Sequence, residues 1–426
     1  MNKKTIKDVE LDGKTVLVRA DYNVPLKDGV ITDDYRIEKS IPTLKYLLER
    51  NCKVIVCSHL GRPSGPDDKS NSLEPVAVRL NQLLEQEVRF STSCVGEHSR
   101  KLINDLPNGA VLLLENLRFH PEEEANDDDF AKQLAEGIEL FVQDGFGVVH
   151  RAHTSTEAIT HHLESVAGLL VEAEVTAITD VIEAPERPLF ALIGGAKITD
   201  KIDMLHRFID IADVVAVGGA MANTFLLAEG IEVGKSLAEP DEVPLAKEIL
   251  SKARAKAKDS NFVFYVPQDG VVSRTIDSAG PTRIVDWGTH AVAEIESYPQ
   301  FPSKESSTVG DDERILDIGP FSGAFIAGAM QLSNTVIWNG AMGVTEVEGL
   351  QSKVGPFSHG TELVVEAMLG QFGHKPRTVV GGGDTVGYIE NQKLVDQFAH
   401  VSTGGGASME LMSGKALPGV EALADN

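Results

Sequence analysis

The stretch LFALIGGAK, residues 189–197, carries the pattern that decides the fold. Five apolar residues are followed at once by two glycines, an alanine and a lysine, and helical period begins after them. Glycine after a buried strand and before a helix lets backbone N–H groups approach an anion closely, and the helix N-terminus adds its positive end. We therefore interpret these residues as a strand of a parallel sheet with a ligand site at its carboxyl end.

Apolar runs of the same kind occur on both sides of this stretch and alternate with segments of helical period. In the N-terminal half we expect strands at 15–18, 53–57, 110–114 and 139–142, and helices at 35–48, 74–84 and 130–135. In the C-terminal half we expect strands at 189–193, 214–217, 262–266, 335–338, 378–380 and 400–402. Such alternation predicts an α/β protein with two doubly wound parallel sheets.

The chain length and one helical segment predict where the two halves meet. A chain of 426 residues exceeds what a single hydrophobic core usually supports, so two domains are expected. Residues 165–184 have helical period and end before Pro185 and Pro188, which fits a connecting helix followed by a helix breaker. We place the first domain at 1–168, the second at 169–408 and a hinge in the connecting helix.

The composition limits the class of partner. The formal net charge of −25 argues against general affinity for nucleic acid or anionic membranes, because both need a basic surface. Cys52, Cys57 and Cys94 are too few and too irregularly spaced for a disulfide framework or a zinc site, so we expect reduced thiols. The first residues are charged and no run of about eighteen apolar residues occurs, so we expect a cytoplasmic protein.

Ligands of open parallel sheets bind beyond the carboxyl ends of the strands, so the residues after each strand are candidates for a site. In the N-terminal half these residues are Asp21, Asn23, Ser58, His59, Arg62, Asn116, Arg118, Asp144, His150, Arg151 and His153, to which we add Arg36. Arginine holds carboxylates and phosphates with a rigid planar fork, so four arginines at one edge indicate a small, doubly anionic ligand. Any single arginine is explained equally well by a surface salt bridge.

The C-terminal half places glycines at the equivalent positions. The runs are Gly194–Gly195, Gly218–Gly219, Gly340 after Asn339, Gly381–Gly383 and Gly404–Gly406. One run would be weak support because loops are rich in glycine, but five at successive strand ends indicate a site for the phosphates of a nucleotide. Lys197 and Lys201 are four residues apart, so both could reach these phosphates. Asp384 is a candidate ligand for a nucleotide-bound Mg²⁺.

Two short motifs suggest other nucleotide sites but fail on spacing. Residues 230–236 resemble a P-loop but have three residues between the glycines where four are needed. Residues 381–387 miss the dinucleotide fingerprint, because Val386 occupies the position of the third glycine. A different transferase or a dehydrogenase on a similar two-domain scaffold stays the secondary alternative, and the dehydrogenase has little support without the dinucleotide fingerprint.

Eight stretches resemble, in the same order, the signature sequences of the phosphoglycerate kinase family. They are VRADYNVPL (18–26), SHLGRP (58–63), LENLRF (114–119), HRAH (150–153), GGAK (194–197), WNG (338–340), GGGDT (381–385) and STGGGAS (402–408). The similarity spans nearly the whole chain, from about residue 16 to residue 419. It is highly specific, because eight ordered motifs do not arise together by chance.

The resemblance implies a kinase that transfers a phosphoryl group reversibly between ATP and the carboxyl group of 3-phosphoglycerate, giving ADP and 1,3-bisphosphoglycerate. By this similarity two Rossmann-like domains face each other across a hinged cleft. The first would bind the acid substrate and would be joined by the C-terminal segment 409–426, and the second would bind the nucleotide. The resemblance further implies Mg²⁺ with the nucleotide, a role in glycolysis and a monomer.

The similarity also assigns residues to the two ligands. The acid substrate would contact Asp21, Asn23, Arg36, His59, Arg62, Arg118 and Arg151. The nucleotide would contact Gly195, Lys197, Lys201, Gly219, Leu316, Asn339, Glu346, Gly382, Gly383, Asp384 and Thr385. Within these sets Glu346 would bind the ribose and Asp384 the metal ion. The catalytic groups would be Arg36, Lys197 and the backbone N–H groups of Gly383 and Gly405.

Three positions depart from the family pattern. Ala220 stands in place of a third glycine, Ala341 in place of a proline and Gly145 in place of an alanine. All three residues are small, so we expect changes in nucleotide affinity or loop stiffness with activity retained. A catalytically silent nucleotide-binding protein on the same scaffold is the alternative. Loss of a charged site residue would favour it, and none is lost.

Overall fold

The computed structural model describes residues 1–65, 67–288, 307–350 and 354–426. These residues form two compact units. Unit 1 consists of Met1–Thr176, Gly406–Leu411 and Lys415–Asn426, and unit 2 of Ala177–Gly405 and Met412–Gly414. The chain passes from the first unit to the second within helix α5 (Leu169–Glu183), so each unit contains part of this helix.

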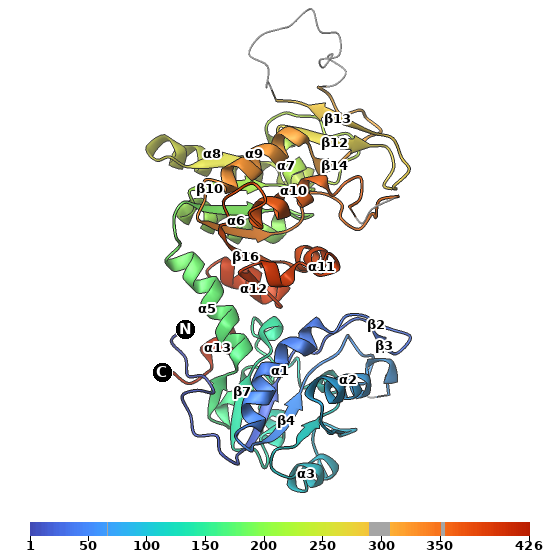
Figure 1. Cartoon of the computed structure of the whole chain (residues 1–426), viewed down its shortest axis with the longest axis vertical. Helices are drawn as coiled ribbons and strands as arrows, with labels where there is room; N and C mark the ends of the chain where they lie inside the picture. The colour runs from blue at the N-terminus through green and yellow to red at the C-terminus, as the bar shows by residue number, and fades with distance from the viewer. Residues whose placement is uncertain (66, 289–306, 351–353) are drawn as a thin grey trace, which may run out of the picture. The chain divides into compact units, whose positions relative to one another are not determined.

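Unit 1 is built on a six-stranded parallel sheet in the order β5-β6-β4-β1-β7-β8. Two of its strands, β4 and β7, are labelled in Figure 1. Its strands are β1 (Thr15–Arg19), β4 (Lys53–Cys57), β5 (Val88–Phe90), β6 (Val111–Leu113), β7 (Leu140–Gln143) and β8 (Ser165–Ala167). Every neighbouring pair is parallel. The carboxyl ends therefore share one edge, where the residues that follow β1, β4, β6 and β7 meet.

Helices cover both faces of this sheet because successive strand residues point to opposite sides. Val16 and Val18 pack in one hydrophobic cluster with α1 and α2, whereas Leu17 packs in another with α3 and α4. The helices are α1 (Tyr35–Leu48), α2 (Glu74–Leu84), α3 (Glu97–Asn104), α4 (Asp128–Leu134) and α13 (Pro418–Glu421). A hairpin, β2 (Leu26–Lys27) with β3 (Val30–Ile31), and the 3₁₀ helices η1 (Lys69–Asn71), η2 (Leu117–Phe119), η3 (Phe146–Val148) and η4 (Ala158–His161) complete the unit.

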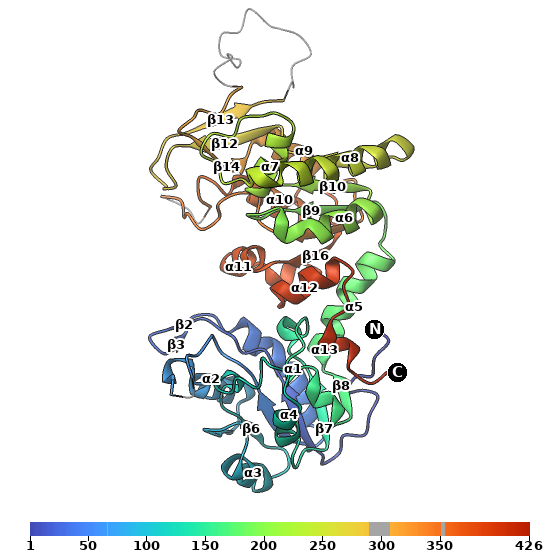
Figure 2. The same ribbon diagram turned by 180° about the vertical axis from the view of Figure 1, so that it is seen from behind.

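The edge strand β8 is paired by residues from both ends of the chain, which lie beside each other in Figure 2. Thr5 forms a parallel bridge with Ala167. From the other terminus, the N–H of Ala424 donates to the carbonyl of Ser165 at 2.9 Å, and Lys3 forms a bridge with Asp425. The last residues of the chain therefore complete the sheet of unit 1.

Unit 2 contains a second six-stranded parallel sheet, in the order β11-β10-β9-β15-β16-β17. Its strands are β9 (Leu189–Ile193), β10 (Val214–Val217), β11 (Val263–Tyr265), β15 (Thr335–Asn339), β16 (Arg377–Gly381) and β17 (His400–Val401). A separate three-stranded antiparallel sheet, in the order β13-β12-β14, consists of β12 (Asp269–Ser273), β13 (Thr282–Asp286) and β14 (Arg314–Ile318).

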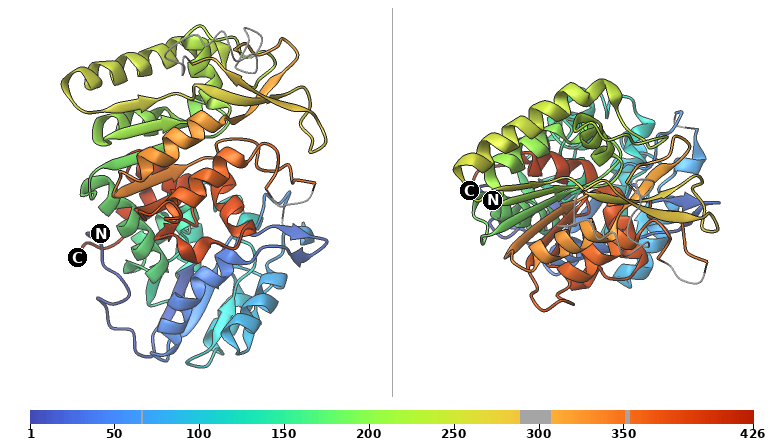
Figure 3. Two further views of the ribbon diagram at one scale, coloured as in Figure 1. Left: turned by 45° about the horizontal axis from the view of Figure 1, so that its top comes forward. Right: turned by 90° about the horizontal axis from the view of Figure 1, so that it is seen from above.

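Helices lie on both faces of the second parallel sheet, as the view from above in Figure 3 shows. One layer contains α6 (Ile202–Ile211), α7 (Met221–Ala228) and α8 (Val243–Asp259), and the other contains α9 (Pro320–Met330), α10 (His359–Met368) and α11 (Gly383–Asn391). Phe190, Leu192 and Trp338 pack against the second layer. The 3₁₀ helices η5 (Thr199–Lys201), η6 (Pro240–Glu242) and η8 (Val395–Gln397) complete the unit. Helix α12 (Gly405–Met412) is shared, because its residues Gly406–Leu411 belong to unit 1.

The two doubly wound parallel sheets confirm the predicted fold class. Each predicted strand corresponds to an observed strand within two residues at either end. The helix expected from residue 165 is wrong at its start, because Ser165–Ala167 is strand β8 and the helix begins at Leu169. Three residues are too short to show a strand period. The antiparallel sheet β12–β14 was not predicted.

A buried carboxylate joins this antiparallel sheet to the rest of unit 2. Asp317 of β14 is 2% exposed; its Oδ1 accepts a hydrogen bond from the N–H of Ile318 at 2.9 Å, and its Oδ2 accepts one from the N–H of Gly360 at 2.8 Å. Burial raises the pKa of Asp317 to about 8, because loss of hydration outweighs these hydrogen bonds to the charged form. Asp317 therefore ties β14 to the start of α10.

This raised pKa makes the stability of unit 2 pH-dependent. The folded protein keeps the proton up to about pH 8, whereas the unfolded chain releases it near pH 3.8. The resulting stabilisation is therefore complete below pH 3.8 and is lost as the pH rises towards 8. In the wild type, this single proton should lower the free energy of unfolding by up to ~1.4 kcal/mol for each pH unit over this range. Asp317→Asn should lack this contribution, so its free energy of unfolding, measured in urea, should fall less steeply with pH. Asp311→Asn removes the same charge elsewhere and serves as the control. If the free energy of unfolding of Asp317→Asn falls with pH as steeply as that of the wild type, the raised pKa of Asp317 is contradicted.

Candidate functional site

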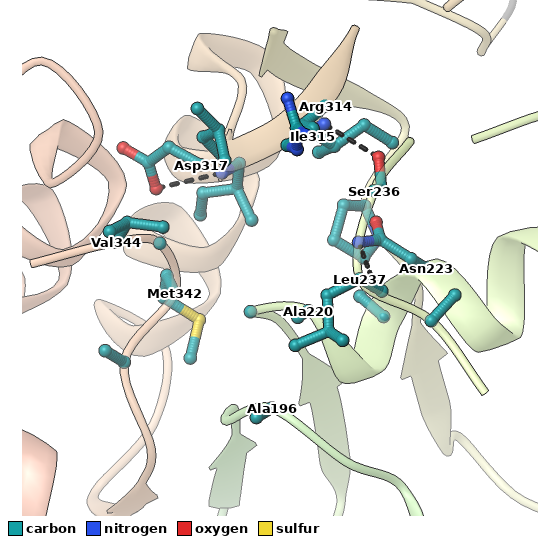
Figure 4. A pocket seen from close by; sticks show the side chains of 18 of the residues that line it. Ala196, Ala220, Asn223, Ser236, Leu237, Arg314, Ile315, Asp317, Met342 and Val344 are labelled. Carbon is teal, nitrogen blue, oxygen red and sulfur yellow. Dashed lines mark hydrogen bonds between the residues drawn. The ribbon is translucent and has the colours of Figure 1, made fainter. Parts of the chain in front are cut away.

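Unit 2 contains a pocket of about 620 Å³ at the carboxyl ends of its strands (Figure 4). This volume lies in the range of small-molecule sites. Five predicted nucleotide residues line it: Gly195, Gly219, Leu316, Glu346 and Asp384. The others, Lys197, Lys201, Asn339, Gly382, Gly383 and Thr385, follow or end the same strands but do not line the pocket.

Close approach of backbone segments shapes the inner end of this pocket. Gly219 has φ +63°, and a Cβ atom there would lie 2.7 Å from the backbone nitrogen of Gly195. Gly340 has φ +100°, and its Cβ would lie 2.3 Å from the carbonyl carbon of Gly194. Side chains are excluded at both positions, because atoms do not approach so closely and the left-handed backbone favours glycine. The chain ends of β9, β10 and β15 therefore meet without side chains between them.

A hydrogen-bonded group links three of these strand ends. Lys201 donates to Oδ1 of Asn339, and the N–H of Gly340 donates to the hydroxyl of Thr385 at 2.8 Å. Burial lowers the pKa of Lys201, and the nearby carboxylates of Asp200 and Asp384 oppose this shift. The Nδ2 group of Asn339 is buried and has no hydrogen-bond partner among the described residues. This amide therefore keeps an unsatisfied donor beside these strand ends.

Two helices begin side by side at the same edge. Gly383 is the first residue of α11, and a Cβ atom on Gly405, at the start of α12, would lie 3.5 Å from its backbone nitrogen. Backbone N–H groups in the first turn of a helix lack partners within that helix and form its positive end. The arrangement is suited to an anion with several oxygen atoms.

Lys197 and Asp384 are exposed charged residues at this edge. In the part of the chain that the structure describes, neither forms a salt bridge or a side-chain hydrogen bond. No group of three His, Cys, Asp or Glu side chains among the described residues could hold a metal ion by itself. The single carboxylate of Asp384 nevertheless fits Mg²⁺, because this ion commonly takes one or two protein carboxylates and completes its shell with water and phosphate oxygens.

Sequence reasoning missed several pocket residues. Met342 lies two residues after the predicted motif at 338–340. A Cβ atom on Gly218 would lie 2.3 Å from the sulfur of Met342, so the Met342 side chain fills the space next to Gly218. Ser236 belongs to the rejected P-loop-like motif, yet it lines the pocket; its hydroxyl accepts from the N–H of Ile315 at 2.8 Å (Figure 4). Trp287, after β13, also lines it. Extending the motif at 338–340 would have found Met342, whereas the other two depend on tertiary contacts.

The polar edge of unit 1 is organised around Asp21. Its Oδ2 accepts a hydrogen bond from Arg36 at 2.9 Å, and its Oδ1 accepts one from the N–H of Asn23 at 3.2 Å. Burial opposes ionisation, but the positive charges, Arg36 foremost, outweigh it and lower the pKa of Asp21. The side chain of Asn23 accepts from the N–H of Gly61 at 2.8 Å, which connects the loops after β1 and β4.

The four arginines differ in their partners. Arg36 pairs with Asp21, and Arg118 pairs with Glu124 at 3.0 Å, so salt bridges account for part of their placement. Arg62 and Arg151 are exposed, and within the described ranges neither forms a salt bridge. For these two, the explanation by a surface ion pair fails, and their guanidinium groups remain available to an anionic ligand.

Other residues of the predicted edge have structural roles. Asn116 accepts hydrogen bonds from the N–H groups of Leu60 and Arg118 at 3.2 and 3.0 Å, which shapes the loops that carry the site. The Oδ1 of Asp144 accepts from the N–H of Leu170 at 2.9 Å at the start of α5, and burial raises the pKa of Asp144 to about 7. The structure thus separates supporting residues from those that can meet a ligand.

Comparison with known proteins identifies a relationship over the full chain. The family model described as phosphoglycerate kinase matches residues 6–415. A phosphoglycerate kinase of Moorella thermoacetica is 44% identical over 425 residues and one of Chloroflexus aggregans is 43% identical over 428 residues, with 100% of both chains covered in each case. In the described residues, no helix is long and apolar enough to cross a membrane.

Solved structures give the same result. The phosphoglycerate kinase of Coxiella burnetii matches with a TM-score of 0.81 and 32% identity, covering 99% of this chain and 98% of that one. The enzyme of Pyrococcus horikoshii has the same TM-score and coverage at 28% identity. Taken with the glycine-lined pocket and the arginine-rich edge, these similarities show that the chain belongs to the phosphoglycerate kinase family.

Proposed function

We propose that this kinase transfers a phosphoryl group from ATP to the carboxylate of 3-phosphoglycerate, giving ADP and 1,3-bisphosphoglycerate, and that it catalyses the reverse reaction in glycolysis. The observation that carries the proposal is the pairing of two different anion sites in one chain. Unit 1 offers guanidinium groups without acidic partners, and unit 2 offers a pocket with glycine-lined strand ends and helix N-termini. These sites suit a small acid and a nucleotide, respectively.

In unit 1, the acid substrate would be held by the residues grouped around Asp21. Arg62 and Arg151 would bind its phosphate or carboxylate directly, because their guanidinium groups have no acidic partner in the described chain. Arg36 would be oriented by its bond to Asp21 and would lie where the substrate carboxylate reacts. Asn23, His59 and Arg118 would complete the site. The first domain, at 1–168 with 409–426, would thus be the acid-binding domain.

In unit 2, the nucleotide would occupy the pocket, with its base near Leu316, its ribose on Glu346 and its phosphates over Gly195 and Gly219. Lys201, Asn339, Gly382 and Thr385 would support the phosphate end. When bound by Asp384 and the phosphates, Mg²⁺ would neutralise part of their negative charge. Ala220 lines the pocket, so its departure from the family pattern would affect nucleotide affinity.

The chemical step needs positioning and positive charge more than covalent help. A carboxylate oxygen of 3-phosphoglycerate forms a bond to the γ-phosphorus while the bond from that phosphorus to the β,γ-bridging oxygen breaks, and its electron pair stays on ADP. The substrate carboxylate is already a nucleophile, so no general base is required. Lys197, Arg36 and the backbone N–H groups of Gly383 and Gly405 would stabilise the charge on the transferring group.

The acid and the nucleotide would bind to different units, so the reaction would require the units to bring their ligands into line and exclude water. Helix α5 (Leu169–Glu183) would act as the hinge, and the closed arrangement would form the predicted cleft. The monomeric state and cytoplasmic location also remain predictions.

A coupled assay tests the proposed reaction. With 3-phosphoglycerate, ATP and Mg²⁺, the purified protein should form 1,3-bisphosphoglycerate, detected as NADH oxidation by added glyceraldehyde-3-phosphate dehydrogenase. Omission of 3-phosphoglycerate should abolish the signal. Nucleotide binding by calorimetry without any turnover would instead favour a catalytically silent nucleotide-binding protein.

Lys197→Ala should lower kcat by orders of magnitude and leave the Kd for 3-phosphoglycerate nearly unchanged. The exposed ammonium group has no carboxylate partner in the described chain, so its charge would act mainly on the transferring group. Lys247→Ala, an exposed lysine of α8, is the control and should behave as the wild type. Near-normal turnover of Lys197→Ala would remove Lys197 from the transition state.

Arg62→Ala should raise the KM for 3-phosphoglycerate with a smaller change in kcat. Loss of a hydrogen bond to a charged group costs about 1.5–3 kcal/mol, which corresponds to roughly a tenfold to hundredfold weaker affinity. Arg100, whose guanidinium pairs with Glu136 at 2.8 Å on the surface of unit 1, provides the matched control Arg100→Ala. An unchanged KM for Arg62→Ala would contradict its assignment to the acid site.

A further inference from the structure

Arg19 is a charged residue in the interior of unit 1. It ends strand β1 and is 1% exposed. Its Nε donates to the hydroxyl of Ser155 at 2.7 Å, one terminal nitrogen donates to the carbonyl of Ala20, and the other contacts Nδ1 of His59 at 3.2 Å. The guanidinium therefore lies behind His59 and has no exposed surface with which to reach a ligand itself.

Glu123 supplies the opposite charge and is equally buried, at 1% exposed. One of its oxygens lies 4.0 Å from Arg19 and accepts a hydrogen bond from the hydroxyl of Ser155 at 2.6 Å. Burial raises the pKa of Glu123, and Arg19 opposes that shift. A buried ion pair of this kind costs much hydration free energy and is a poor source of stability by itself. Its contact with His59 suggests another purpose.

The contact with Arg19 determines which nitrogen of His59 carries the proton. Arginine can only donate hydrogen bonds, so Nδ1 of His59 must accept and the proton of the neutral ring must be on Nε2. The competing partner of Nδ1 is Oδ1 of Asp21, but it is 4.0 Å away, beyond hydrogen-bond distance. The direct contact therefore decides the tautomer.

The ring is held neutral by its surroundings. Burial lowers the pKa of His59 well below its usual value; Arg19, Arg118 and Arg36 add to this effect, and only Asp21 opposes it. The Nε2 atom forms no hydrogen bond with any residue that the structure describes. It is therefore an available donor in a ring that cannot rotate freely, since the side chain is only 5% exposed.

We propose that Arg19 is a positioning residue that fixes His59 in the tautomer with the proton on Nε2, so that His59 presents an N–H donor to the anionic acid substrate. Without Arg19, Nδ1 would keep the proton and face Asp21, and Nε2 would turn a lone pair towards an anion. A donor would thus become a repulsive group. The identity of the ligand as the acid substrate rests on the function proposed above. The tautomer of His59 does not depend on that function.

The tautomer can be measured directly in the free wild-type protein. Long-range ¹H–¹⁵N correlation spectra distinguish protonated from unprotonated ring nitrogens, and His59→Gln identifies the signals. We expect an unprotonated Nδ1 and a protonated Nε2 throughout the neutral pH range. A proton on Nδ1, or a charged ring at neutral pH, would overturn the proposal even if the protein is fully active.

Kinetic variants test whether Arg19 acts through His59. Arg19→Met combined with Glu123→Gln removes both buried charges together, which avoids leaving one of them unpaired. If it folds, this double variant should raise the KM for 3-phosphoglycerate roughly tenfold to a hundredfold, the range for losing a hydrogen bond to a charged group, with a smaller change in kcat. Arg19→Lys keeps a charged donor, so it should retain the proton on Nε2 of His59 and bind 3-phosphoglycerate more tightly than the double variant does.

Introducing Arg19→Met and Glu123→Gln into a His59→Ala protein tests whether Arg19 acts by positioning His59 or only by supporting the fold. If Arg19 acts through His59, the added substitutions should cause no further rise in KM, because the shared interaction is already lost. An equal rise in both backgrounds would overturn the proposal. Arg100→Met, on the surface of the same unit, should leave both the tautomer and the KM unchanged. Should the double variant fail to fold, the wild-type spectra and Arg19→Lys still decide the matter.

Discussion

Exclusion of side chains at three neighbouring strand ends is the constraint on which the proposed nucleotide site depends. Strands β10, β9 and β15 are adjacent in the sheet, and the glycines that follow them bring their backbones into contact. A Cβ atom on Gly194 would lie 2.3 Å from the carbonyl oxygen of Ala341, and one on Gly219 would lie 2.7 Å from Gly195. The N–H groups of Gly194, Gly219 and Gly340 already donate to Asn339, Met342 and Thr385. The close approach therefore clears space for phosphates, and a chain with a net charge of −25 would have to supply most of the N–H donors from helix N-termini.

Unit 1 meets the same demand for positive charge in a different way. It uses guanidinium groups, and buried carboxylates hold two of them in place: Asp21 holds Arg36, and Glu123 lies behind Arg19. Each carboxylate is itself fixed by backbone or hydroxyl donors. An acidic protein can thus maintain a locally cationic site, because buried carboxylates compensate these guanidinium groups: Arg36 stays partly exposed, whereas Arg19 is buried with its carboxylate.

Much of this organisation could be predicted from the sequence. Central strands such as β1, β4 and β9 are continuous apolar runs, because both faces of a doubly wound sheet are buried, and the residues after them had to share one edge. Strand β8 was mistaken for helix because three residues carry no period. Strands β12–β14 were missed because they mix polar and apolar residues outside the parallel pattern. The burial of Arg19 was also invisible, since an arginine after an apolar run usually marks the strand's exposed end.

The pairing of β8 with the C-terminus has a consequence for biosynthesis. All six strands of the first sheet belong to the first 167 residues, yet Ser165 receives its hydrogen bond from Ala424. While the ribosome is still making the second unit, the first sheet must therefore wait with an incompletely paired outer strand, a feature that invites association with other chains. Ala424, made long after the first sheet, closes this edge, so a chain that stops before it would lack the closure even with its whole first sheet made.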